Sequence, residues 1–258
     1  MFAAASVGSG AEDRFTVRLL TTANELRPFL PAWQALAASA LEPNAFYEPW
    51  QVIPALQCLS DAPALELLLV LNDNTEPPSV CGVFPLQRRA TYRGLPVPSL
   101  RMWQHKYCFL CTPLVSRAHA SSTLRCFLTW LASNSTRCEV MSLQSVRADG
   151  AFAEALKQAL TEFKRPHFEE ACYARALLEV SGAQDGLAYL DTALSKKKTK
   201  EYRRLAQRLS EQGTMQFERL LPGAALLPWL DEFLALEASG WKGREGSITL
   251  SSVSEDRS

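Results

Sequence analysis

The sequence has few of the residues that metal sites and hydrolase sites need. It contains three histidines, and none lies beside a serine motif typical of a nucleophile elbow, so a Ser-His-Asp hydrolase is unsupported. Its one Cys-x-x-Cys pair, Cys108 and Cys111, has no second pair, and His105 is the only histidine near it. Because protein metal sites use three or four ligands, we predict no metal site.

The chain also lacks an excess of either charge and any long apolar run. Lys plus Arg and Asp plus Glu both number 27, so no global field attracts nucleic acid or membrane. No stretch approaches the ~20 apolar residues of a membrane span, and the N-terminus has no cationic segment of the signal-peptide kind. Seven cysteines scattered through apolar segments are typical of reduced thiols. We therefore predict a cytoplasmic protein without a membrane span.

With 258 residues and 47% hydrophobic content, the chain has enough apolar material for two modest cores. In its first part the apolar runs and their periods predict the order β-α-α-β-β-β-α-β-α-β. Thr22 and Glu25 have the spacing of a capping box, and Asp149 is placed to cap a helix. The expected strands are 15–20, 65–71, 80–86, 99–103, 139–143 and 174–180, and the expected helices lie near 26–36, 49–59, 124–131 and 150–163.

After a Ser-Gly break at 181–182, a second set of elements begins. We expect helices at 187–194, 195–209 and 226–236, and a strand at 215–220. The tail at 247–258 is rich in serine and differs in composition from the rest of the chain. We interpret it as a truncation or a shifted reading frame, and a flexible natural terminus is the alternative.

The helix at 195–209 has a strong charge asymmetry. Tyr202, Leu205, Ala206 and Leu209 form one narrow apolar stripe, and Glu201 is the single acid. Seven cations surround the stripe: Lys196, Lys197, Lys198, Lys200, Arg203, Arg204 and Arg208. This face predicts binding of an anion, such as the phosphate of a nucleotide or of a lipid carrier, or an anionic glycan. A charged face that serves solubility is the alternative, and the lack of interleaved aromatic residues disfavours nucleic acid.

A second chemical stretch follows the helix at 226–236. Gly240 is placed as its C-cap, and three glycines then surround four polar or aromatic residues that we predict to bind a polar substrate: Trp241, Lys242, Arg244 and Glu245. Glu237 continues the apolar stripe of the preceding helix. We predict that it faces inward with a raised pKa and acts as a general base toward an amine, and a solvent-facing carboxylate is the alternative.

The basic helix and the Trp-Lys-Gly loop together resemble a known family. The pairing is similar to the GNAT-type acyltransferases of the BioF2-like or CelD (cellulose biosynthesis) kind, which are related to the FemAB aminoacyltransferases. The resemblance implies an α/β fold with a mixed sheet flanked by helices, in tandem GNAT-like lobes. It divides the chain into a disordered N-terminus (1–13), a degenerate first lobe (14–181), an incomplete second lobe (182–246) and the atypical tail (247–258).

For function, the resemblance implies an acyl-CoA-dependent N-acyltransferase with acetyl-CoA or another acyl-CoA as donor. The acceptor would be an amine of a sugar, an amino acid or an envelope precursor. Residues 104–122, where the family carries its glycine-containing phosphate loop, contain no glycine. We therefore expect the chain to be inactive by itself. The alternative is a non-catalytic accessory protein of polysaccharide biosynthesis that uses the basic helix to bind its partner.

The resemblance also suggests an acceptor cleft in the first lobe. Aromatic and imidazole groups near its turns fall where FemAB-like proteins form part of that cleft. We predict that Tyr47, Trp50 and His105 bind substrate there, with core packing as the alternative.

Overall fold

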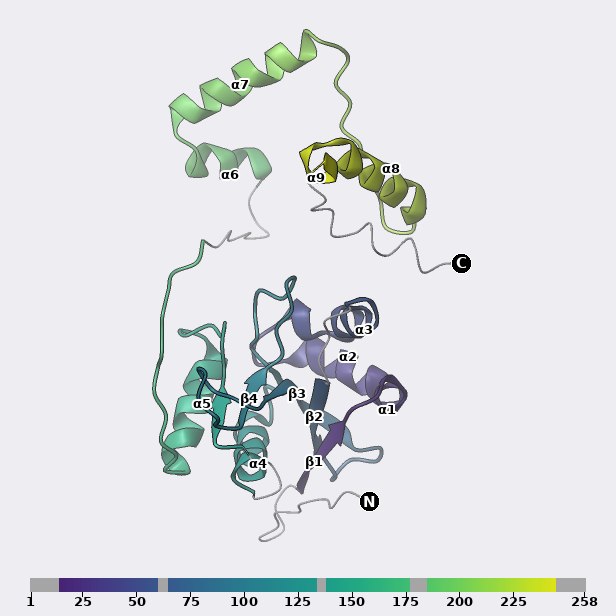
Figure 1. Cartoon of the computed structure of the whole chain (residues 1–258). Coiled ribbons are helices and arrows are strands. Elements are labelled where there is room, and N and C mark those ends of the chain that lie inside the picture. Colours follow the sequence, from purple (N-terminus) through teal and green to yellow (C-terminus); the bar gives the residue numbers. More distant parts are fainter. Residues whose placement is uncertain (1–13, 60–64, 134–137, 177–184, 245–258) are drawn as a thin grey trace. The chain divides into compact units, whose positions relative to one another are not determined.

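The computed structural model describes residues 14–59, 65–133, 138–176 and 185–244 (Figure 1). The chain divides into two compact units: unit 1 ends at Cys172 and unit 2 begins at Tyr173. Unit 1 contains a β-sheet with helices, whereas the described part of unit 2 is helical.

Unit 1 is a mixed α/β unit, which confirms the predicted fold class. Its six strands form one sheet in the order β1-β2-β3-β4-β6, and β5 pairs separately with β3. The elements are β1 (Phe15–Leu20), α1 (Ala23–Leu26), η1 (Arg27–Phe29), α2 (Leu30–Ser39), η2 (Ala45–Tyr47), α3 (Pro49–Cys58), β2 (Leu65–Asn72), β3 (Ser79–Arg89), β4 (Ser99–Met102), β5 (Leu114–Val115), α4 (Ala120–Ala132), β6 (Val140–Ser142) and α5 (Ala151–Glu162).

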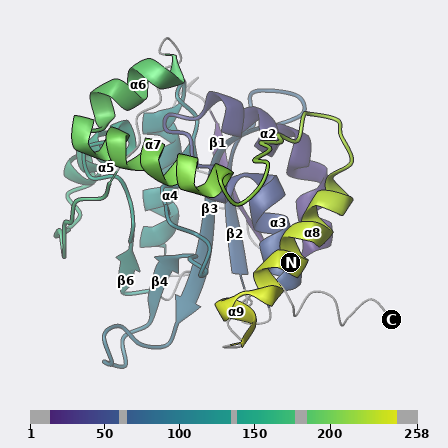
Figure 2. The ribbon, with the colours of Figure 1, turned by 90° about the horizontal axis from the view of Figure 1, so that it is seen from above.

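Helices cover both faces of this sheet. The helices α1 to α3 lie on one side, and α4 and α5 lie on the other (Figure 2). Accordingly β2 and β3 are nearly continuous apolar runs rather than alternating ones, because both of their faces are buried. Phe84 of β3 stacks on Phe127 of α4 with ring centroids 4.1 Å apart. Gly82 lets α4 approach closely, since a Cβ there would lie 2.7 Å from the Thr123 side chain.

The first helical segment begins at the predicted capping box. The Thr22 hydroxyl accepts a hydrogen bond from the Glu25 backbone, and the Glu25 carboxylate accepts one from the Thr22 backbone. Pro28 and Pro31 then fall within the run, which is divided into α1, η1 and α2. Proline lacks the N–H that an uninterrupted helix would use, so a short 3₁₀ turn lies between the two helices.

The connection through α4 makes the sheet mixed. Strands β1 to β4 pair antiparallel, whereas β6 returns beside β4 in the parallel direction, with Leu100 opposite Met141. A parallel neighbour needs a crossover, and α4 supplies it. Both β4 and β5 pair with the same edge of β3, where Leu86 faces Met102 and Val83 faces Leu114.

Two expectations for unit 1 need correction. Asp149 does not cap α5: Gly150 is the N-cap residue, and the Asp149 carboxylate binds the Arg147 guanidinium at 2.8 Å. The carboxylate of the distant Glu42 instead accepts a hydrogen bond from the Phe152 backbone at 2.9 Å. Residues 174–176 are exposed and not in a strand, so that part of the expected strand at 174–180 is wrong, and the rest lies outside the described residues.

The described part of unit 2 consists of α6 (Gly186–Ala193), α7 (Lys196–Ser210), α8 (Leu226–Ser239) and α9 (Trp241–Arg244). The three predicted helices are present, and Ser195 caps α7 by accepting a hydrogen bond from the Lys198 backbone. The strand expected at 215–220 is wrong. Its alternation is strand-like, but no strand pairs with it within 185–244, and Phe217 is 90% exposed.

None of the helices in the described part of the chain has the length and apolar content needed to cross a bilayer. The tail at 247–258 lies outside the described residues.

Candidate functional site

A long excursion interrupts the sheet between β4 and β5. Met102 and Leu114 pair with residues three positions apart on β3, at 86 and 83, yet twelve positions separate them along the chain. The intervening residues, which we name the 103–113 loop, therefore leave the sheet at the carboxyl end of β4. Because β6 runs parallel to β4 along Ser99–Arg101, the carboxyl ends of both strands lie at this edge of the sheet.

The η2 region holds the 103–113 loop from one side. Asn44 is buried, and its amide donates hydrogen bonds to the carbonyls of Thr112 at 2.7 Å and Leu110 at 3.1 Å. The Tyr47 hydroxyl donates to the Trp103 carbonyl at 2.7 Å. Trp33 then fixes Tyr47, because its indole N–H donates to the Tyr47 carbonyl at 2.9 Å.

The segment after β6 holds the loop from the other side. The Cys111 backbone N–H donates to the Ser145 carbonyl at 3.0 Å, and the Gln104 amide donates to the Ser145 hydroxyl at 3.3 Å. Gln144 donates to the Met102 carbonyl. The loop is thus hydrogen-bonded across the carboxyl ends of both β4 and β6.

The cysteine pair lies inside this loop. The Cys108 and Cys111 sulfurs are 4.0 Å apart, and both side chains are buried. Hydrogen bonding with Cys111 and burial raise the pKa of the Cys108 thiol, so Cys108 is protonated near neutral pH. Within the described ranges no three His, Cys, Asp or Glu side chains gather as metal ligands. Both cysteine side chains are packed within the loop.

His105 is half-buried in the loop beside Trp103, with ring centroids 4.8 Å apart. Its Nδ1 accepts a hydrogen bond from the Tyr107 backbone at 3.3 Å, which leaves the proton of the neutral ring on Nε2. Nε2 is buried without a hydrogen-bond partner. Desolvation by burial lowers the pKa of His105, so the neutral ring is the favoured form.

The predicted cleft residues of unit 1 have different environments. Tyr47 is fully buried, so the prediction that it lines a cleft needs correction: its hydroxyl is used by the Trp103 carbonyl. Trp50 is 60% exposed at the start of α3, and its indole N–H donates to the Glu48 carboxylate at 2.6 Å. Phe109 at the loop tip is also exposed and packs edge-on against Phe46, with centroids 5.8 Å apart.

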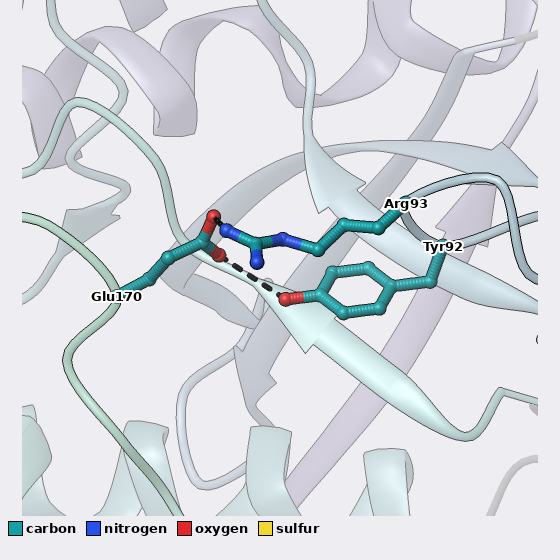
Figure 3. A network of polar contacts seen from close by, with 3 residues as sticks. All are labelled: Tyr92, Arg93 and Glu170. Atoms are coloured by element: carbon teal, nitrogen blue, oxygen red, sulfur yellow. Dashed lines mark hydrogen bonds and ion pairs between the residues drawn. The ribbon is translucent and has the colours of Figure 1, made fainter.

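Hydrogen bonds fix Glu170, which lies close to the end of unit 1. The Glu170 carboxylate accepts hydrogen bonds from the Arg93 guanidinium and from the Tyr92 hydroxyl (Figure 3). These two residues lie in the turn between β3 and β4, where Arg93 has φ 50° and Gly94 has φ 80°. The hydrogen bonds lower the pKa of Glu170. These hydrogen bonds thus connect Glu170 to the β3–β4 turn.

The predicted anion-binding residues lie together on α7. No residue of this helix is buried, and within the described chain none of its cations forms an ion pair. The members of the cationic set are Lys196, Lys197, Lys198, Lys200, Arg203, Arg204 and Arg208.

The predicted substrate loop of unit 2 is a helical turn instead. Trp241–Arg244 form α9, which packs on the end of α8, and a Cβ at Gly243 would lie 1.9 Å from the Ala238 carbonyl oxygen. Glycine there allows the chain to turn directly after α8. Gly240 occupies the α8 C-cap, as predicted.

The remaining predicted residues of unit 2 stay predictions. Trp241 is 59% exposed, and Glu237 is half-buried on α8. Lys242 and Arg244 are residues of α9. Glu245 lies outside the described residues.

Sequence reasoning did not find the residues that tie down the 103–113 loop. Asn44 and its partners are 66 and 68 positions apart, and Gln144 and Met102 are 42 apart. A single buried amide has no local signal in a sequence. The absence of glycine from residues 104–122 indicated only that the family's phosphate loop is missing, not how the segment is held.

Comparisons with known proteins gave no match to a family model and no match among curated proteins. Among solved structures, the aminoglycoside 6'-N-acetyltransferase AAC(6')-Ih from Acinetobacter baumannii is 15% identical, covers 63% of this chain and 99% of its own, and has a TM-score of 0.36. AAC(6')-IG from Acinetobacter haemolyticus is 13% identical, with coverages of 63% and 99% and a TM-score of 0.35. An integron cassette protein from V. cholerae is 9% identical, with coverages of 69% and 98% and a TM-score of 0.38. Likenesses this weak carry no functional inference.

Proposed function

We propose that the protein is of the GNAT N-acyltransferase type but inactive by itself, and that unit 1 provides the acceptor side and does not hold the acyl donor. The observation that carries the proposal is the topology of unit 1. Four consecutive antiparallel strands, β1 to β4, are followed by a helical crossover to β6, which runs parallel beside β4. A mixed sheet flanked by helices is what the family resemblance implies, and it supports the same superfamily as the basic helix and the Trp-Lys-Gly segment.

The residues of unit 1 do not fit the acyl-CoA that the resemblance implies. A pyrophosphate needs free backbone N–H groups at a glycine-containing turn before a helix. The segment before α4 has no glycine, and the Arg117 guanidinium is occupied by the carbonyls of Ala40 and Leu41 at 3.2 and 3.1 Å. The 103–113 loop is also bonded across the ends of β4 and β6. A donor site would therefore have to come from outside unit 1.

The acceptor side rests on Trp50 and Glu48, which directly follow the η2 turn along the chain. Trp50 presents an indole whose N–H is bonded to the Glu48 carboxylate, so an aromatic face lies beside a negative charge. A protonated amine is attracted both by the π-face and by the carboxylate. This chemistry suits an amine of a sugar, an amino acid or an envelope precursor. We extend the same proposal to Trp241, Lys242, Arg244 and Glu245 as substrate contacts and to Glu237 as the base.

Calorimetric titration of the full chain with a panel of amino sugars and amino acids tests this role. We expect at least one amine to bind and the Trp50→Ala variant to weaken its binding about tenfold, which corresponds to the loss of about 1.4 kcal/mol. Leu95→Ala is the matched control, because Leu95 is also 60% exposed in unit 1. Amine binding that Trp50→Ala leaves unchanged would refute the acceptor site.

A second candidate function is that of a non-catalytic accessory protein that binds an anionic partner through α7. The specific observation in its favour is the set of cations on that helix, none of which forms an ion pair with another described residue. Titration with acetyl-CoA separates the two functions. Binding that is lost in the Lys200→Gln/Arg203→Gln/Arg204→Gln variant would support the enzyme, whereas binding of an anionic glycan or lipid without affinity for acetyl-CoA would support the accessory role.

A further inference from the structure

Helix α7 has two opposite faces of different chemistry. Lys196, Lys200, Arg203, Arg204 and Arg208 follow one another at intervals of three or four residues or are adjacent, which places them on one side of a helix with 3.6 residues per turn. Tyr202, Leu205 and Leu209 recur at i, i+3 and i+7 on the other side, and Lys198, four residues before Tyr202, lies at the N-terminal end of that side. The helix is therefore amphipathic, with low overall apolar content.

Both faces of α7 are accessible. The apolar stripe is not covered: Tyr202 is 53% exposed, Leu205 46% and Leu209 56%. Across the part of the chain that the structure describes, no carboxylate is paired with the cations, and Glu201 is the only acid within α7. A partner that binds both faces of α7 must carry negative charge and must also remove the apolar stripe from water.

We propose that α7 lies on the surface of an anionic phospholipid bilayer, parallel to its plane. This inference deepens the second candidate function, anion binding by α7. The apolar stripe would enter the boundary between headgroups and acyl chains, and the Lys and Arg side chains would extend along it to the lipid phosphates. A soluble polyanion would engage the cationic face only and would leave the stripe in water. The bilayer is therefore the partner that suits both faces.

Both faces should contribute measurable affinity. Each Lys or Arg near an anionic membrane surface adds to the binding free energy. Removal of three of them should therefore weaken binding by about 100-fold at low salt. Replacing two stripe leucines with serine should weaken binding by about tenfold or more, because apolar side chains no longer leave water. Higher ionic strength should weaken the binding as screening shortens the range of attraction.

Co-sedimentation of the full chain with vesicles tests the proposal. One vesicle set contains phosphatidylcholine alone, and the other contains phosphatidylcholine with phosphatidylserine. The charge variant is Lys200→Gln/Arg203→Gln/Arg204→Gln, and its matched control removes three exposed cations of unit 1, Lys157→Gln/Lys164→Gln/Arg165→Gln. The stripe variant is Leu205→Ser/Leu209→Ser. Far-UV circular dichroism of every variant checks that the helical content is kept, which is expected because α7 has no buried residue.

The proposal is supported if the chain binds the anionic vesicles and not the neutral ones, if both α7 variants weaken binding, and if the control variant changes it by less than a factor of about three. Parallel titrations use a sulfated polysaccharide and duplex DNA. Binding to either polymer without vesicle binding, unaffected by the stripe variant, overturns the bilayer and leaves anion binding by α7 intact. No binding to vesicles or polymers overturns both. Equal binding of both vesicle types would refute the role of the cations.

Discussion

Tyr47 connects three segments of unit 1 through one side chain and its backbone. Its hydroxyl donates to the Trp103 carbonyl, its own carbonyl accepts from Trp33, and its ring is fully buried. Burial raises the pKa of this phenol well above its ordinary value, with the neighbouring Cys111 as a further cause. The hydroxyl therefore remains protonated and acts as a fixed donor.

We expect Tyr47→Phe to lower the free energy of unfolding by about 1–2 kcal/mol, because the change leaves the buried Trp103 carbonyl without its donor. Urea denaturation followed by circular dichroism measures the change. Tyr107→Phe is the control, since Tyr107 reaches solvent. Equal stability of the two variants would show that the Tyr47 hydroxyl is dispensable.

His105 makes the stability of unit 1 depend on pH. The pKa of its imidazole is lowered by burial, so below the unfolded value of about 6.5 the unfolded chain binds a proton that the folded chain resists. The contribution of His105 is therefore complete above about pH 6.5 and is lost as pH falls through the folded pKa. We expect His105→Gln to reduce the loss of stability between neutral and mildly acidic pH. The exposed His167→Gln is the control, and identical pH profiles for wild type and His105→Gln would contradict the assignment.

At the scale of elements, α5 obtains its N-terminal cap from a residue far away in the sequence. The Glu42 carboxylate accepts from the Phe152 backbone and lies where a Cβ on Gly150 would be, since that Cβ would meet the Glu42 Oε1 at 1.9 Å. The negative charge also lies at the positive end of the helix dipole. The absence of a side chain at Gly150 thus makes room for the cap.

We predict that Gly150→Ala and Glu42→Ala each lower the free energy of unfolding by about 1 kcal/mol, because each removes the same cap. The double variant should lose little more than either single variant, since the two changes act on one interaction. Urea titration of the four proteins gives the coupling, with Gly213→Ala as a control, where a Cβ meets nothing within 4 Å. Additive losses would mean that Gly150 and Glu42 act independently.

At the same scale, the sequence identified most of the elements and few of the contacts between them. The strand bounds 15–20 and the Thr22 capping box were predicted closely, because apolar periods and local caps depend on neighbouring residues. The expected strand at 215–220 failed because a strand needs a pairing partner, which a local pattern does not contain. The prediction that Asp149 caps α5 failed for the same reason. The residue that caps it, Glu42, is 110 positions from Phe152, and a local pattern does not contain such a contact.

At the scale of the whole molecule, α8 is the described helix that carries the most exposed large apolar side chains. Leu226, Leu227, Leu236 and Phe233 are each at least half exposed, and Trp229 and Leu230 are 40% exposed. Exposed clusters of this size favour association. We expect the purified chain to bind a hydrophobic dye, with less fluorescence from a Leu227→Ser/Leu236→Ser variant. Leu95→Ser is the control in unit 1, and a dye signal equal in all three proteins would place the dye elsewhere.

Catalysis is also a property of the whole molecule, because it needs a donor and an acceptor held together with hydrogen-bond donors near the reacting carbonyl. In unit 1 the 103–113 loop is bonded across the ends of β4 and β6, and the described part of unit 2 contains four helices and no strand. We therefore expect purified 1–258 to transfer no acetyl group from acetyl-CoA to any amine of a broad panel, as followed by release of the free thiol. Steady turnover that disappears in Glu237→Gln or Lys242→Ala would contradict this expectation and would place a working donor site in unit 2.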